Sequence, residues 1–458
     1  MEVIDIRKNS RFKLSTTHIL MLSFILIILT GTFLLSLPIS SSNGQAVPFI
    51  DALFTATTAS CVTGLVVVPT VSAWSTFGQI VILLLIQIGG LGLITAIAAI
   101  AVMLQKKIGL SSNMLLQDSL NLNSADGIAN FVKKVVLGAF LIEGIGAILY
   151  MFVFVPEFGL HGIWISVFTS ISAFCNAGLD VIAENSLCNY ATNPWINFVT
   201  STLIILGGLG FIVWFDVCRI IKSRKSKRKL GLKDLTLHSK IVLSITTLLI
   251  ITGAVLILLF EFNNTKTIGN YSLFDKIQIA LFQSITTRTA GFATIPQENL
   301  LNSSALVCFI LMFIGGSPVG TAGGVKTVTV VVFLASGLST IRNNNDVNLF
   351  NRRIAKDTIR KSIAVITVSF MIMMLSTLLL SLTMNANLVD ILFETISATA
   401  TVGLSRNLTT SLNLVGKIII ATTMYLGRVG PISLAIAFNF KKEKQNMIRN
   451  PQEDITVG

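Results

Sequence analysis

The sequence predicts an all-α polytopic membrane protein with four repeats around a pseudo-fourfold axis. Each repeat is expected to be a membrane span, a short re-entrant pore helix and a second span. Hydrophobic residues make up 53% of the 458 residues and charged residues 12%, a composition typical of polytopic membrane proteins. Eight apolar runs reach the length of about 20 residues that crosses hydrocarbon about 30 Å thick. Between them, a polar segment ending in glycine occurs four times, with glycine spacings of 114, 113 and 112 residues.

The eight runs define the spans and the repeats. The first run is expected to stay in the protein, because it is long and no small-residue cleavage site follows it. The runs lie near 17–37, 75–103, 131–155, 196–221, 240–262, 301–339 (interrupted), 362–383 and 412–439. The corresponding repeats are 16–105, 128–222, 240–341 and 362–440, with linkers 223–239 and 342–361 and terminal segments 1–15 and 441–458.

Lysine and arginine lie mostly at one side of the predicted bundle. The N-terminus, the C-terminal tail and the loops that follow the second, fourth and sixth spans are basic, so both termini are expected in the cytoplasm. The net charge of +13 then reports topology and the anionic face of the lipid bilayer, and we expect no nucleic-acid partner. The basic run at 222–229 has two interpretations: a solvated loop beside lipid headgroups, or a docking surface for a cytosolic partner.

Each polar segment is predicted to begin with a helix too short to span the membrane. These pore helices are expected over about 51–59, 162–173, 273–287 and 388–398. Asp51 and Asp390 each precede the phenylalanine of their segment by three residues. We expect them to cap their helices, where a carboxylate complements the positive end of the helix dipole. Attraction of cations from outside is an additional role that their position allows.

After each pore helix, an extended stretch leads to the glycine. Backbone carbonyls can replace the water shell of a monovalent cation without adding charge, so that binding stays weak enough for release. Aiming successive carbonyls in one direction requires positive φ angles, which glycine adopts easily. The third segment is one residue shorter than the others between its phenylalanine and its glycine. The predicted filter residues are Cys61, Val62, Thr63, Gly64, Cys175, Asn176, Ala177, Gly178, Thr289, Ala290, Gly291, Ala400, Thr401, Val402 and Gly403.

The sixth run is interrupted by a glycine-rich stretch at 315–325 that cannot hold a continuous helix. Val325 separates Gly324 from Lys326, so the stretch lacks the Gly-Lys-Ser/Thr of a phosphate-binding loop. Irregular backbone at membrane depth is tolerated where it lines a cavity, which favours a flexible gate below the filter over a simple kink. The predicted gate residues are Gly315, Gly316, Ser317, Pro318, Gly320, Thr321, Gly323, Gly324, Lys326 and Arg428.

Two arginines lie at membrane depth, where a charge demands a partner or water. Arg428 is expected in the pore below the filter, as a positive barrier to cations. Arg288 lies within the third filter segment, where a guanidinium in the ion path would block it. We therefore expect Arg288 to point behind the filter, as support, toward pore-loop carbonyls or acids; Glu394 is one candidate partner.

The filter strings "TTRTAGF" and "SATATVGLS", with "FIGGSPVGTAGGVKT" and "GRVGP", resemble the Trk/Ktr/HKT superfamily of potassium transporters. The similarity covers essentially the whole chain and is greatest to the Ktr-type membrane subunit, because no extra helix pair precedes the first repeat. Glycine at all four filter positions resembles the potassium-selective members. The plant sodium-type relatives carry serine at the position of Gly64.

The resemblance implies potassium uptake across a bacterial cell membrane, with the potassium ion at the filter carbonyls and the gate loop acting together with Arg428. It also implies a homodimer with one pore per chain, sodium-stimulated flux and a cytosolic ring of regulatory subunits that bind ATP or ADP. A nucleotide would then act only through that partner, and no covalent cofactor is expected. The alternatives are a sodium-translocating or sodium-coupled symporter of the same fold and a non-transporting membrane scaffold. No catalytic constellation, disulfide framework or zinc spacing is present in the sequence, so an enzyme is not expected.

Overall fold

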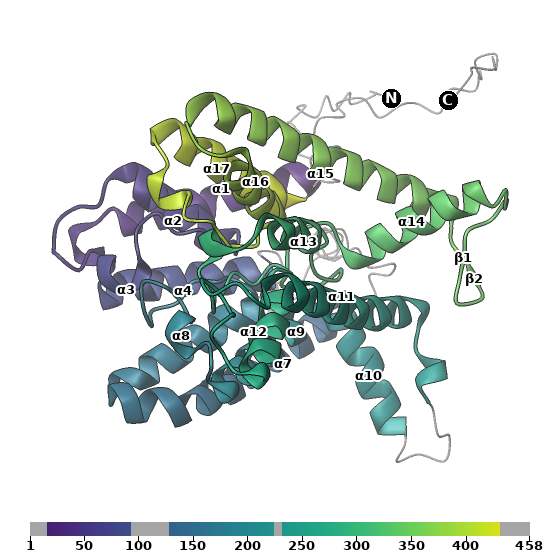
Figure 1. The fold of residues 1–458 in the computed structure, drawn as a ribbon, viewed down its shortest axis with the longest axis horizontal. Coiled ribbons are helices and arrows are strands. Elements are labelled where there is room, and N and C mark those ends of the chain that lie inside the picture. The colour runs from purple at the N-terminus through teal and green to yellow at the C-terminus, as the bar shows by residue number, and fades with distance from the viewer. Residues whose placement is uncertain (1–15, 93–127, 224–230, 431–458) are drawn as a thin grey trace, which may run out of the picture.

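The computed structural model describes residues 16–92, 128–223 and 231–430, and these ranges are mostly helical. Parts of several predictions lie outside the described residues: the N-terminal segment, the end of the second span, most of the basic run and the C-terminal tail. A short antiparallel hairpin, β1 (Asn348–Leu349) with β2 (Arg352–Arg353), projects from the helices between α14 and α15 (Figure 1).

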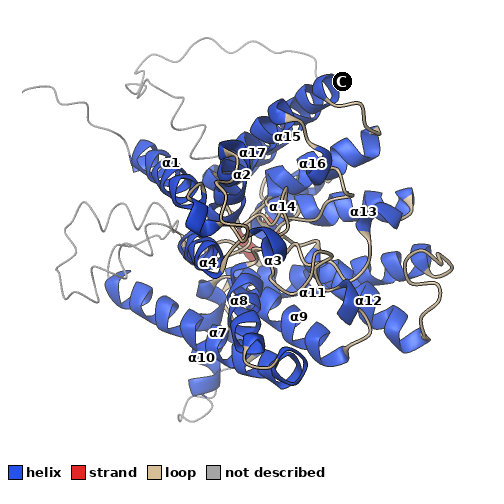
Figure 2. Ribbon diagram, turned by 90° about the vertical axis from the view of Figure 1, so that its left-hand side faces the viewer, coloured by secondary structure: helices blue, strands red, loops and turns tan. Residues whose placement is uncertain are grey.

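Helices lie over the four predicted pore helices and over the described part of each apolar run. Figure 2 shows them arranged around loops near the centre of the molecule. Their bounds are α1 Thr16–Leu35, α2 Phe49–Ser60, α3 Thr70–Ala73, α4 Thr76–Leu91, α7 Ile128–Phe158, α8 His161–Cys175, α9 Pro194–Gly208, α10 Phe211–Ser223, α11 Leu237–Glu261, α12 Leu273–Thr286, α13 Asn302–Phe313, α14 Thr327–Ile341, α15 Lys356–Thr383, α16 Leu388–Ala400 and α17 Leu414–Val429.

Within the described ranges, three helices are each long and apolar enough to cross a membrane: α7, α11 and α15. The pair α9 and α10 passes the same test when the two are taken together, although they are bent by 100°. The exposed residues of the long helices are largely apolar, for example Phe152 of α7, Leu259 of α11 and Leu382 of α15. A surface of this kind suits lipid rather than water.

The fourth predicted span is not one continuous helix. We expected a single run over 196–221, and the structure divides it into α9 and α10 at Leu209. Glycine lies on both sides of the break, and Gly210 has a φ of 87°, a left-handed conformation that ends a helix. A hydrophobic run alone therefore gave the correct segment but missed its bend.

The four short helices α2, α8, α12 and α16 match the predicted pore helices to within two residues at each end. They and the residues after them form the interior of the protein. Residues 54–65, 172–182, 282–292 and 393–402 are all buried. The core around them includes the phenylalanine that begins each repeated segment: Phe54, Phe168, Phe282 and Phe393.

Candidate functional site

The structure brings the four repeated glycines together in a closed ring. A β-carbon built on Gly64 would lie 3.1 Å from the Cα of Gly178 and 3.2 Å from the Cα of Gly403. One built on Gly291 would lie 3.0 Å from the Cα of Gly178 and 3.3 Å from that of Gly403. Each glycine thus meets its two neighbours in chain order, and the last meets the first.

The ring also has a consistent direction, which is set by carbonyl groups. A β-carbon on each glycine would meet the carbonyl oxygen of the residue just before the next glycine, at 2.5 Å for Gly64 and 2.7 Å for both Gly178 and Gly291. A side chain at any of these positions would force the facing backbone to shift, which favours glycine at all four. The contacts run from Gly64 to Ala177, from Gly178 to Ala290, from Gly291 to Val402 and from Gly403 to Thr63.

The backbone before each glycine is more sharply turned than the extended strand that the sequence predicts. The residue two positions before every glycine is left-handed: Val62 (φ 54°), Asn176 (φ 58°), Thr289 (φ 68°) and Thr401 (φ 51°). The glycines themselves have φ between 66° and 98°. Four non-glycine residues in this rarely populated region, at one equivalent position, are a functional signal.

Hydrogen bonds to the preceding helix hold three of these turns alike. The amide before the glycine donates to the carbonyl five residues earlier, as Thr63 does to Thr58 and Val402 does to Ser397, both at 2.8 Å. In the third segment, Ala290 instead donates to Thr286, four residues earlier, at 2.9 Å. The third segment is one residue shorter, and its turn is one residue tighter than the other three. Gly291 therefore still lies in the ring.

The glycine-rich loop at 314–326, between α13 and α14, lies against the segments that carry three of the glycines. The side chain of Thr321 donates to the carbonyl of Phe174 at 3.0 Å and accepts from the amide group of Asn176 at 3.3 Å. The amide of Gly323 donates to the Thr289 hydroxyl at 3.1 Å. A β-carbon on Gly323 would collide with the side chain of Thr401. Polar side chains two residues before three of the glycines thus contact the loop.

Arg428, near the end of α17, joins this loop to the first repeat. It is half-buried, and its Nη1 atom donates to the carbonyl of Thr321 at 2.8 Å. Its Nη2 atom donates to the carbonyl of Gly89 in α4. A fixed positive charge therefore lies between the loop and α4.

Arg288 supports the loop rather than an acid. Its Nη2 atom donates to the carbonyl of Gly315, at 3.2 Å, behind the third segment. Glu394, which we considered as a partner, instead accepts hydrogen bonds from the hydroxyls of Ser405 at 2.6 Å and Thr409 at 2.5 Å. Arg288 and Glu394 are thus hydrogen-bonded to different groups, and the expected contact between them is not formed.

The two aspartates lie near the positive ends of their helices, as expected, but neither occupies the capping position. Pro48 and Asn387 occupy the capping positions of α2 and α16, and the aspartates lie in the first turn. Asp51 pairs with Lys417 at 2.6 Å, and Asp390 pairs with Arg406 at 2.7 Å. These acids therefore bind cationic side chains of the fourth repeat.

Sequence reasoning missed a buried polar cluster behind the second segment. Glu143 of α7 accepts from the amide group of Gln87 of α4 at 3.1 Å, and the thiol of Cys175 lies 3.8 Å from each of these two side chains. A glutamate in the middle of a long apolar run is a signal that could have found it.

A second missed residue is Asp180, in the loop between α8 and α9, two positions after Gly178. Burial raises the pKa of its carboxyl from 3.8 to about 6, and hydrogen bonds from Ser186 and two backbone amides partly offset that rise. The equivalent positions after the other three glycines carry no ionisable residue. The carboxyl is charged above pH 6 and neutral below it.

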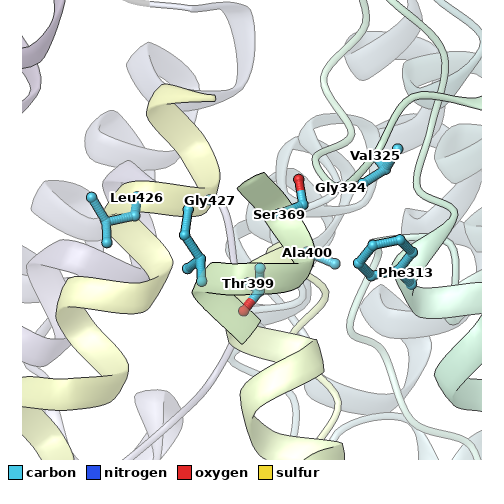
Figure 3. Close-up of a pocket in the computed structure, with 9 residues that line it drawn as sticks. Phe313, Gly324, Val325, Ser369, Thr399, Ala400, Leu426 and Gly427 are labelled. Carbon is cyan, nitrogen blue, oxygen red and sulfur yellow. The ribbon is translucent and has the colours of Figure 1, made fainter. Parts of the chain in front are cut away.

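A small pocket lies on the other side of the loop, toward α17. Figure 3 shows Phe313 and Ala400 in it beside the loop end at Gly324 and Val325, with Gly427 of α17 near Thr399. Its lining residues are Phe313, Gly324, Val325, Ser369, Ile372, Thr399, Ala400, Leu426 and Gly427.

Taken together, the site offers backbone carbonyl oxygens in a ring, with hydrogen-bonded supports behind them. Among the described residues, no group of three or more His, Cys, Asp or Glu side chains could hold a metal ion. Neutral carbonyl oxygens suit a weakly held monovalent cation. The arrangement therefore fits the passage of such an ion better than its permanent binding.

Comparison with known proteins gives a consistent match. The family model for TrkH, described as a cation transport protein, matches residues 7–450. The "Ktr system potassium uptake protein B" of Bacillus subtilis is 38% identical over 442 residues, which cover 96% of each chain. The "Potassium/sodium uptake protein NtpJ" of Enterococcus hirae is 36% identical over 458 residues, 99% of each chain.

Among solved structures, the fold is similar to that of the potassium transporter TrkH from Vibrio parahaemolyticus. The TM-score is 0.73, and the match covers 94% of this chain and 86% of the other. The two sequences are only 17% identical, so this likeness concerns the fold alone.

Proposed function

Because this chain belongs to the TrkH family of cation transport proteins, we propose that it carries potassium ions into the cell through a path ringed by Gly64, Gly178, Gly291 and Gly403. The family is one of transporters rather than enzymes. The observation that carries the proposal is the directed ring, in which each glycine meets the carbonyl of the residue before the next. Relatives named as potassium uptake proteins over nearly the full length of the chain support the choice of ion.

In this proposal, the carbonyl oxygens of the four segments take the place of the water shell that the ion loses. The left-handed residues before the glycines turn successive carbonyls toward the path. The membrane potential drives entry, with about 2.3 kcal/mol per charge for each 100 mV. Because no fixed negative charge lies in the ring, binding stays weak enough for release.

The architecture that we propose has four repeats of span, pore helix and span, with eight spans in all and both termini in the cytoplasm. The loop at 314–326 is its gate. It closes the path below the ring through its contacts with Thr289 and Thr401, and Arg428 adds a positive barrier there. We further propose a homodimer and a cytosolic ring of nucleotide-binding subunits, in line with relatives named as members of a Ktr system.

A second candidate function is sodium transport or sodium coupling on the same fold, because one relative is named a potassium/sodium uptake protein. The test is uptake in cells that lack their own potassium importers, with potassium or sodium as the sole permeant ion. Potassium uptake without sodium present supports the first proposal. Uptake of sodium alone, or a strict requirement for sodium, supports the second. A Gly64→Ser variant is the matched comparison, because serine occupies this position in sodium-type relatives.

The loop is tested by deleting residues 315–325 and measuring rubidium uptake at matched membrane abundance. We expect higher uptake than in the parent protein, with less dependence on any regulatory partner. A well-expressed deletion variant without uptake would contradict the gate.

A further inference from the structure

The loop is paired with the bend between α9 and α10 through its backbone. The amides of Ser317 and Thr321 donate to the carbonyls of Gly208 and Gly207, at 2.9 and 3.1 Å, respectively. In the opposite direction, the amide of Phe211 donates to the carbonyl of Val319 at 2.8 Å. Three hydrogen bonds thus join alternate residues of the loop to the helix break, and any movement of α10 at its first residue would pull on the loop.

Close approach at the bend depends on two glycines. A β-carbon on Gly210 would collide with the carbonyl of Pro318, and one on Gly320 would lie 2.9 Å from the carbonyl of Gly207. The two backbones therefore touch without side chains between them. This contact is as close as those within the glycine ring.

Aromatic packing joins the start of α10 to the second filter segment. The indole of Trp214 donates to the carbonyl of Leu206 at 3.0 Å, across the bend. Its ring centroid lies 5.7 Å from that of Phe174, whose carbonyl accepts from Thr321. The start of α10 therefore contacts both the loop and the helix behind the loop.

The other half of α10 is joined to the start of α11 by a buried carboxylate, that of Asp216. Oδ2 of Asp216 accepts from the amide of Thr236 at 2.9 Å and from its hydroxyl at 2.8 Å. Thr236 caps α11. Oδ1 of Asp216 pairs with Arg219 at 2.7 Å, and Arg219 also donates to the carbonyl of Asp234. In Figure 1, α10 diverges from the other helices beyond this point.

We propose that Asp216 is a positioning residue for the gate: it fixes α10 on the start of α11, and α10 in turn holds the loop in its closed place below the glycine ring. The inference rests on the loop acting as the gate. When Asp216 loses its hydrogen bonds to Thr236, α10 can shift. The backbone hydrogen bond between Phe211 and Val319 then breaks, and the loop can move.

The test compares Asp216→Ala, Asp216→Asn and the parent protein in rubidium uptake at matched membrane abundance. We expect Asp216→Ala to raise uptake by about fivefold, at the low end of typical coupling between sites. Asp216→Asn keeps one acceptor oxygen for Thr236 and should give a smaller rise. Cys218→Ala, an exposed change in the same helix, is the control and should leave uptake unchanged.

Repeating Asp216→Ala in the deletion of 315–325 separates positioning from general damage. If Asp216 acts through the loop, the substitution has no further effect once the loop is absent. An equal change in both backgrounds would overturn the inference. If deletion of the loop itself does not raise uptake, the gate proposal fails instead, so the two failures are distinguishable.

A readout independent of flux is the reaction of Val319→Cys, in the Cys218→Ala background, with a membrane-impermeant thiol reagent applied from the cytoplasmic side. Asp216→Ala should make this cysteine react several-fold faster in protein that still elutes as a single folded species. An unchanged rate, together with unchanged uptake, would show that α10 does not hold the loop.

Discussion

Nη1 of Arg428 donates a 2.8 Å hydrogen bond to the carbonyl oxygen of Thr321, which joins the last described helix to the loop below the glycine ring. The side chain of the same threonine bonds to the second filter segment. Thr321 therefore links a fixed charge, the loop and a filter segment within one residue. Changes at either end of this link should alter gating more than stability.

Replacing Arg428 with alanine should raise potassium uptake. The substitution removes a positive charge from the path and a charge-assisted hydrogen bond to the loop, which is worth about 1.5–3 kcal/mol, or roughly 10- to 150-fold in the open population. Rubidium uptake in proteoliposomes measures the effect, with Arg428→Lys as the charge-conserving comparison. Uptake equal to that of the parent protein would place the charge outside the path.

A methyl group at Gly291 should close the ring. Gly291 has a φ of 83°, and its β-carbon would lie 2.7 Å from the carbonyl of Val402. Strain of about 1–3 kcal/mol at such a position, added to the steric contact, predicts at least a tenfold loss of uptake for Gly291→Ala. Gly337→Ala in α14 is the control, because nothing lies within 4 Å of its β-carbon. Equal uptake by the two variants would contradict the filter.

Thr321→Val should weaken closure while keeping the side-chain volume. The substitution removes the bonds to Phe174 and Asn176, each worth about 0.5–1.5 kcal/mol, so we expect a rise in basal uptake of roughly 5- to 150-fold. Thr202→Val, whose hydroxyl bonds within its own helix, is the control. A fall in uptake at normal abundance would show that the threonine serves the ion path itself.

Uptake should depend on external pH through Asp180. Burial raises the pKa of this carboxyl to about 6, so lowering the pH from 7.5 to 5 removes a negative charge near the outer mouth. A charge several Å from a cation contributes about 0.5–1 kcal/mol at the dielectric constant of water, which predicts a two- to fivefold rise in the half-saturating potassium concentration. Asp180→Asn should show the higher value at both pH values. A pH effect that persists in Asp180→Asn would assign it to another group.

The ion pair between Asp51 and Lys417 should stabilise the contact between the first and fourth repeats. Its members are largely buried, with side-chain exposures of 14% and 16%. We expect Lys417→Met to lower the stability by about 1 kcal/mol, measured as a shift in the thermal melting temperature in detergent. A double-mutant cycle with Asp51→Asn isolates the pair, and strict additivity would show that the two side chains do not interact.

Periodicity and repetition were sufficient to predict much of this fold. The four pore helices were located from short polar segments, because their length is incompatible with spanning and their phenylalanine and glycine recur at one spacing. The meeting of Gly64 with Gly403 followed only from the assumption of symmetry. Residue types gave the need for glycine at these positions, but not the left-handed turn two residues earlier at Val62 or Thr401.

Interactions between distant segments were not predictable in the same way. Arg288 had several acceptors within reach of any plausible backbone, so its choice of Gly315 over Glu394 depended on packing. The bend at Leu209 was not predictable because both halves of the run are apolar, and hydropathy does not report the direction of a helix axis. Nothing in the sequence distinguishes Asp216 from other polar residues near a helix end. Only the structure shows that its carboxylate binds Thr236 at the start of α11.

The closing contact between Gly403 and Gly64 has a consequence for biosynthesis. The first glycine emerges from the ribosome long before its final neighbour, so the nascent protein contains three quarters of a ring with one open side. Membrane insertion of the early helices must therefore tolerate an incomplete polar interior until α16 arrives. Chains truncated before that helix should be recognised and degraded, however well their earlier helices have folded.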